Sequence, residues 1–204
     1  MTLHAFDFDG TLTTSDTLLL FIRHARGRWA LLGGLLLYSP RLVLMKLGLV
    51  DNGRTKERLF GHYFRGMLER DFDALCTSFA RSHTHILRTQ GLRAIRLALE
   101  RGESVVVLSA SIDRWVQACL NQFIDDTTLF KVLGTQIEVA NGRLTGKFST
   151  LNCYGSEKVR RLKEWLESEK VGTKGALEMI AYGDSRGDKE LLAMAKESHY
   201  KPFR

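Results

Sequence analysis

Three short apolar runs constrain the fold of this chain more than any other feature. They span residues 3–8, 104–108 and 179–182, and each precedes a helical pattern. Small or polar residues follow each run, beginning at Gly10, Ser109 and Gly183. Buried strands that alternate with helices are typical of a parallel α/β sheet, whose ligands bind at the carboxyl ends of the strands. We therefore expect an α/β fold with a site at that edge.

Helical and hairpin signals between these runs support this expectation. Apolar residues recur at helical spacing in three segments, residues 92–100, 156–170 and 189–195. Residues 136–139 and 143–148 resemble two strands separated by Ala140-Asn-Gly142. An Asn-Gly pair between strand-like segments predicts a β-hairpin.

The first two strands are too far apart for a simple crossover. Roughly 100 residues separate Asp7 from Ser109, whereas a whole βαβ unit needs only about 30. The pattern of residues 16–88 is helical throughout. We therefore predict an α/β core formed by residues 1–15 and 89–204, with residues 16–88 inserted as a helical cap.

Composition narrows the classes of protein and of partner. The 204 residues are 44% hydrophobic and 26% charged, which excludes a disordered chain. The net charge of +7 favours anionic partners such as phosphorylated compounds or an acidic membrane face. No nucleic-acid-binding motif accompanies that charge, so we expect no nucleic-acid partner. Three scattered cysteines and an N-terminus without a secretory pattern predict a cytoplasmic location, with the inner membrane face as an alternative.

One segment of the predicted cap is unusually apolar. Residues 30–50 hold few polar side chains, and Arg23, Arg26 and Arg28 precede them. One interpretation is a pair of cap helices that bury against each other. A second is peripheral contact of residues 22–50 with an anionic membrane, and a third is a membrane-spanning helix. Pro40 and Arg41 near the middle disfavour the third interpretation.

The chemistry is concentrated where the first strand ends. Asp7 and Asp9 are two positions apart and therefore point to the same side of the chain. Gly10 lets the chain turn away without placing a side chain in the site. Two neighbouring carboxylates repel each other unless a cation lies between them. Oxygen ligands of this kind suit Mg2+, which also accepts phosphate oxygens.

Four motifs in order resemble the haloacid dehalogenase superfamily of phosphatases, in its phosphoserine-phosphatase-like subfamily. Asp7-Phe-Asp9-Gly-Thr-Leu-Thr13 is similar to the first motif and Ser109 to the second. Lys158 is similar to the third, and Gly183-Asp184-Ser-Arg-Gly-Asp188 to the fourth. The resemblance covers nearly the whole chain and implies a Rossmann-like parallel core with an inserted helical cap.

The resemblance implies a role for each motif residue. Asp7 would be the nucleophile that forms an aspartyl-phosphate, and Asp9 would be the general acid and base. Mg2+ would be held by Asp7, by the backbone carbonyl of Asp9 and by Asp184. Phosphoryl oxygens would be bound by a further set: Ser109, Ala110, Gly10, Thr11 and Lys158.

Two of these residues also have purely structural interpretations. Lys158 falls in the first turn of a predicted helix, where a cation is disfavoured by about 0.3–1 kcal/mol unless it has a partner. It is either an exposed lysine or an ammonium group aimed at phosphate and Asp7. Ser185 and Asp188 have the spacing of a capping box. The family pattern instead makes Asp188 a residue that supports the metal ligands, and both interpretations can hold together.

The expected activity is Mg2+-dependent hydrolysis of a phosphomonoester. The presence of Asp9 argues against dehalogenase chemistry. The alternative to an enzyme is a non-catalytic basic protein that binds membranes. The segment from Ser109 departs from the Ser-Gly-Gly pattern of phosphoserine phosphatases, and Asp16 stands where those enzymes usually place a glutamate. Cys153-x-Gly-x-Glu-Lys-Val159 resembles phosphatidylglycerophosphatase C relatives, which implies a phospholipid head-group phosphate. Phosphoserine, histidinol phosphate and sugar phosphates remain open, as does the oligomeric state.

Overall fold

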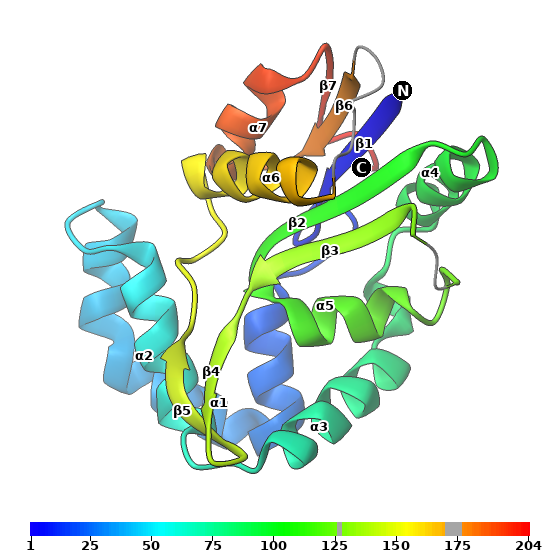
Figure 1. The fold of residues 1–204 in the computed structure, drawn as a ribbon. Helices are drawn as coiled ribbons and strands as arrows, with labels where there is room; N and C mark the ends of the chain where they lie inside the picture. Colours follow the sequence, from blue (N-terminus) through cyan, green and yellow to red (C-terminus); the bar gives the residue numbers. More distant parts are fainter. Residues whose placement is uncertain (126–127, 170–176) are drawn as a thin grey trace.

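The computed structural model describes residues 1–125, 128–169 and 177–204. Within these residues, five parallel strands form one sheet in the order β3-β2-β1-β6-β7 (Figure 1). The strands are β1 (Thr2–Asp7), β2 (Ser104–Ile112), β3 (Phe130–Thr135), β6 (Glu178–Gly183) and β7 (Glu197–Tyr200). β1 lies at the centre, between β2 and β6. The predicted parallel α/β fold is confirmed.

The two faces of the sheet bury different helices, because side chains alternate along each strand. Leu3 and Ala5 of β1 pack in one apolar cluster with Leu162 and Leu191, from α6 (Ser156–Ser168) and α7 (Lys189–Met194). Phe6 points into a second, larger cluster on the other face. That cluster includes residues of α4 (Thr89–Glu100) and α5 (Asp113–Leu120). The last residue of the helix predicted over 156–170 lies outside the described residues.

Between β1 and α4 the chain is helical, as expected for the inserted segment. The three helices there are α1 (Thr17–Lys46), α2 (Asn52–Phe64) and α3 (Glu69–Ser82), followed by a short 3-10 helix, η1 (Thr84–Ile86). They lie beyond the carboxyl ends of β1 and β2 (Figure 1). The division of the chain at residues 15 and 89 stays a prediction.

The predicted hairpin forms and packs against the inserted helices. Its strands are β4 (Ile137–Ala140) and β5 (Arg143–Phe148). Asn141 and Gly142 both have positive φ, 50° and 70°, as a tight two-residue hairpin turn requires. α2 and β5 approach closely, because a Cβ on Gly61 would lie 2.7 Å from the carbonyl oxygen of Gly146. The hairpin thus belongs spatially with α2, although it follows β3 in the sequence.

The apolar segment at 30–50 is buried on one side only. It continues α1 after an abrupt turn at Gly27, whose φ of 83° is non-helical. Gly34 lies against Tyr63 of α2, whereas Leu36 is 77% exposed. The interpretation of this segment as cap helices that bury against each other is therefore wrong for the side that faces away from α2. Among the described residues, no helix is both long enough and apolar enough to cross a membrane.

Candidate active site

Asp7 occupies the last position of the central strand, where its carboxylate meets Lys158. The Lys158 ammonium donates to Asp7 Oδ1 at 2.5 Å and to Asp188 Oδ1 at 2.6 Å. All three side chains are buried, and Lys158 is among the largest fully buried side chains. The interpretation of Lys158 as an exposed lysine at a helix start is therefore wrong.

Burial and charge act in opposite directions on this cluster. Burial raises the pKa of Asp7 to about 7, although Lys158 pulls it down. Burial alone would lower the pKa of Lys158, but the two carboxylates outweigh it and raise that pKa. Asp188 keeps a lowered pKa despite its burial, because Lys158 and Ser185 donate to it. The cluster is thus a buried ion pair network centred on the ammonium group.

A third carboxylate completes the cluster. Oxygens of Asp7, Asp184 and Asp188 lie within 4.8 Å of one another, a spacing that allows a shared metal ion. Asp184 follows β6, and burial together with Asp188 raises its pKa, opposed by Arg204. Gly10 leaves room for this carboxylate, since a Cβ there would lie 2.4 Å from Asp184 Oδ2. Gly10 also has a φ of +83°, which favours glycine.

These residues fit a hard divalent cation. Asp7 Oδ2 is buried and has no hydrogen-bond partner among the described residues. An unpartnered buried carboxylate oxygen is costly unless something binds it. Carboxylates without histidine or cysteine are the donor set that Mg2+ prefers. Asp7 Oδ2 and the carboxylate of Asp184 are therefore the groups available to such an ion.

Asp188 has both of the roles that its spacing allowed. Its Oδ2 accepts from the Ser185 amide at 3.0 Å and from the Ser185 hydroxyl at 2.8 Å, in a capping box. The Asp184 amide also donates to this oxygen, at 3.1 Å. The other oxygen of Asp188 accepts from Lys158. Asp188 therefore fixes both the lysine and the backbone of Asp184, which is a candidate metal ligand.

Asp9 is held by donors from two other elements. Its Oδ1 accepts from the amide and the hydroxyl of Thr17, at 2.7 and 2.6 Å. Its Oδ2 accepts from Ser111 at 2.7 Å and from Ser109 at 3.3 Å. Thr17 is the first residue of α1, so an otherwise unpaired amide at the start of that helix points at the carboxylate.

The predicted phosphate-binding residues lie around this pair of aspartates. Ser109 is fully buried within β2, three residues before the strand ends, and its hydroxyl accepts from the Ser111 amide at 3.0 Å. The Thr11 hydroxyl is buried and has no partner among the described residues. The Gly10 amide already donates to Thr13 Oγ1, at 3.1 Å. The Ala110 carbonyl accepts from Thr135 at 3.2 Å, which ties β2 to β3 beside the site.

Besides Ser111, which donates to Asp9, sequence reasoning missed three residues of this environment. Thr17 and Trp115 are linked, because the Trp115 indole donates to the Thr17 hydroxyl at 3.1 Å. Both are fully buried. The third is Arg204, whose guanidinium pairs with Asp184. The position of Thr17 one residue after the N-cap Asp16 was the only available signal, since an N-terminal helix amide attracts a carboxylate.

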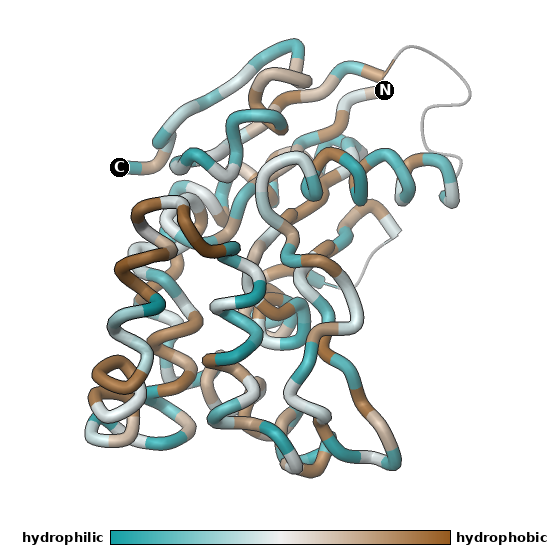
Figure 2. The backbone as a smooth tube through the Cα atoms, turned by 90° about the vertical axis from the view of Figure 1, so that its left-hand side faces the viewer, coloured by the Kyte–Doolittle hydropathy of each residue, from teal (hydrophilic) through white to brown (hydrophobic). Residues whose placement is uncertain are grey.

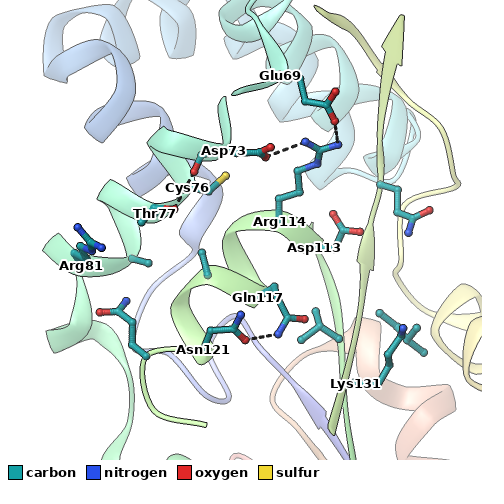
Figure 3. Close-up of a pocket in the computed structure, with 16 residues that line it drawn as sticks. Glu69, Asp73, Cys76, Thr77, Arg81, Asp113, Arg114, Gln117, Asn121 and Lys131 are labelled. Carbon is teal, nitrogen blue, oxygen red and sulfur yellow. Dashed lines mark hydrogen bonds and ion pairs between the residues drawn. The ribbon is translucent and has the colours of Figure 1, made fainter. Parts of the chain in front are cut away.

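A large pocket of the molecule lies apart from these residues. It has a volume of about 880 Å3 and opens between α3, α5 and β3. Figure 3 shows Arg114 between Glu69 and Asp73, with which it forms ion pairs of 2.6 and 2.8 Å. None of the predicted site residues lines this pocket. Its size therefore does not make it the catalytic site.

Comparisons with known proteins agree with this geometry. The family model described as haloacid dehalogenase-like hydrolase matches residues 5–193. A curated relative, Protein CicA of Caulobacter vibrioides, is 32% identical over 98% of this chain and 86% of its own length. The chain belongs to the haloacid dehalogenase-like hydrolase family.

Solved structures show the same fold. A Bordetella pertussis protein of unknown function is 20% identical, with a TM-score of 0.82 over 97% of this chain and 88% of its own. A phosphoserine phosphatase that carries a phospho-aspartyl intermediate analogue is 17% identical, with a TM-score of 0.62 over 96% and 84% of the two chains. The fold is therefore that of the phosphoserine-phosphatase-like members, as the motifs implied.

Proposed function

We propose that the chain hydrolyses phosphomonoesters through an aspartyl-phosphate at Asp7. The observation that carries this proposal is the buried carboxylate of Asp7, with one oxygen on Lys158 and the other unpartnered. A carboxylate held in this way is a nucleophile whose orientation is fixed before substrate arrives. The solved phosphoserine phosphatase with a phospho-aspartyl analogue supports the same chemistry for this fold.

The reaction has two displacements. Asp7 attacks phosphorus, the ester bond to the leaving oxygen breaks, and protonated Asp9 gives its proton to that oxygen. Asp9 then takes a proton from water, which attacks the phosphorus and releases inorganic phosphate while the Asp7 carboxylate is restored. Throughout, Lys158 and Ser109 stabilise the phosphoryl oxygens by donating to them.

Mg2+ is part of the proposal. Asp7, the backbone carbonyl of Asp9 and Asp184 would hold it, and Asp188 would keep Asp184 and Lys158 in place. Bound there, the ion would neutralise charge that otherwise repels an anionic phosphate from the carboxylates. Arg204 pairs with Asp184 Oδ2, so its guanidinium would compete with a bound cation for the Asp184 carboxylate.

For the substrate we propose a phosphate on a phospholipid head group. What favours it is the exposed apolar second half of α1, a helix whose first residue, Thr17, binds Asp9. Soluble phosphomonoesters such as phosphoserine, histidinol phosphate or a sugar phosphate are the alternative.

The test is phosphate release from phosphatidylglycerophosphate in mixed micelles, phosphoserine and histidinol phosphate, with Mg2+ and with EDTA. We expect Mg2+-dependent release, fastest with the lipid. Asp184→Asn should need far more Mg2+, whereas Asp71→Asn, which changes an exposed acid on α3, should not. Release that is unaffected by EDTA would contradict the metal assignment. Preference for a soluble ester would contradict the proposed lipid substrate but not the proposed reaction.

A further inference from the structure

The second half of α1 and the residues just after it expose an unusual number of large apolar side chains. Each of these side chains is at least 40% exposed: Trp29, Leu32, Leu36, Leu37, Val43, Leu44, Leu47 and Leu49. We call them the apolar ridge. In Figure 2, which views the side where α1 and α2 lie, strongly hydrophobic stretches run along these helices. A contiguous exposed apolar surface of this kind marks an interaction site.

Most of the ridge is one side of the second half of α1, and α2 covers part of the opposite side. Trp29, Leu32, Leu36 and Val43 recur at the spacing that aligns residues along one face. On the other face, Gly34 lies against Tyr63 of α2, whose hydroxyl donates to the Ala30 carbonyl at 2.9 Å. α2 thus fixes the helix, and the apolar ridge points away from the rest of the protein.

Positive charge borders the ridge. The sequence of α1 contains no acidic residue, and Arg28 and Arg41 lie in its second half. At about 100° per residue, Arg28 and Arg41 fall on opposite flanks of the ridge. The Arg28 guanidinium lies 4.5 Å from the centre of the Trp29 ring. An apolar face with tryptophan and leucine between basic flanks is the pattern of a helix that lies in a membrane interface.

We propose that the apolar ridge docks on an anionic lipid bilayer, with α1 in the plane of the interface. Acyl chains would cover the leucines, and acidic head groups would pair with the flanking arginines. A second copy of the chain fits less well, because a two-fold contact would bring two basic flanks together. The ridge contains no residue of the catalytic site, so docking does not depend on the proposed reaction.

Vesicle co-sedimentation of the full chain tests this proposal. We expect binding to vesicles of phosphatidylcholine with phosphatidylglycerol at low salt, and much weaker binding to phosphatidylcholine alone. The triple variant Leu32→Ser/Leu36→Ser/Val43→Ser should lower the partition coefficient by more than about tenfold, because each serine removes apolar area from the interface. Raised salt should weaken wild-type binding by screening the arginines.

A matched triple variant controls for the loss of exposed apolar surface in general. Leu97→Ser/Met194→Ser/Tyr200→Ser changes three exposed side chains outside the ridge and should bind vesicles as the wild type does. Circular dichroism confirms that each variant is folded. The proposal is overturned if the wild type does not bind anionic vesicles at low salt, or if both triple variants bind equally well. A wild-type dimer that the ridge variant dissociates, without vesicle binding, would assign the ridge to a second copy instead.

Tryptophan fluorescence gives an independent measurement in the same samples. Trp29 is 71% exposed, whereas Trp115 and Trp165 are buried in the protein. Docking should shift the emission of Trp29 to the blue and make it quenchable by lipids brominated on the acyl chains. Trp29→Phe should remove that change. Unchanged emission on binding would show that the ridge stays in water, which contradicts the proposal.

Discussion

Thr17 gives both its amide and its hydroxyl to one oxygen of Asp9, at 2.7 and 2.6 Å. The first turn of α1 therefore orients the residue assigned as general acid and base. Asp9 lies after β1, so this contact also joins the inserted helices to the sheet. Trp115 donates to the same threonine hydroxyl and fixes its position from α5.

Removing the Thr17 hydroxyl should slow the step that needs the acid. Hydrogen bonds to charged groups contribute about 1.5–3 kcal/mol, so we expect Thr17→Val to lower kcat/KM, which reports the first displacement, about 10-fold to 100-fold. The loss should be larger for an alkyl phosphate than for p-nitrophenyl phosphate, whose leaving group needs no proton. Thr17→Ser, which keeps the hydroxyl, should restore most of the rate. Equal losses with both substrates would show that Thr17 is only structural.

Gly10→Ala should impair metal binding beyond the backbone strain that any side chain causes at a positive φ. The new Cβ would lie 2.4 Å from Asp184 Oδ2 and would displace that carboxylate. Gly66→Ala is a matched control, because Gly66 has nearly the same φ, +82°, with nothing within 4 Å of an added Cβ. Titration calorimetry with Mg2+ should show a loss of affinity of at least about tenfold for Gly10→Ala alone. The assignment of Asp184 fails if both variants bind the ion equally.

Lys158→Met should destabilise the protein and increase its dependence on Mg2+. It leaves the buried Asp7 and Asp188 carboxylates without their ammonium partner, at a cost of about 3–5 kcal/mol. A divalent cation would replace part of that charge. Thermal unfolding should show a lower Tm than wild type and a larger Mg2+-induced rise. Lys163→Met changes an exposed lysine of α6 and should leave both quantities unchanged.

Much of the fold could be predicted because its signals are local. The strand that ends at Asp7 is a mainly apolar run, and Asn141-Gly142 has the turn chemistry of a hairpin. Local patterns could not predict which element packs against each apolar surface. The hairpin packs on α2, which precedes it by about 80 residues. Likewise, the apolarity of 30–50 did not tell which side of the helix α2 would cover.

The site was predictable where a motif marks it and not where packing builds it. Asp7, Lys158, Asp184 and Asp188 stand in recognisable segments, and the structure brings them together. Thr17 and Trp115 carry no motif, because threonine at a helix start and tryptophan in a core are common. The contact of Thr17 with Asp9, and that of Trp115 with Thr17, depend on how α1 and α5 approach each other in three dimensions.

The central claim is that Asp7 carries the phosphoryl group between the two displacements. Acid quenching during turnover, borohydride reduction and peptide mass spectrometry test it most directly, because reduction converts an aspartyl-phosphate to homoserine. We predict homoserine at position 7, more of it in Asp9→Asn, and none in Asp7→Asn, which should be folded and inactive. Homoserine at another aspartate, or phosphate release by Asp7→Asn at the wild-type rate, would contradict the account.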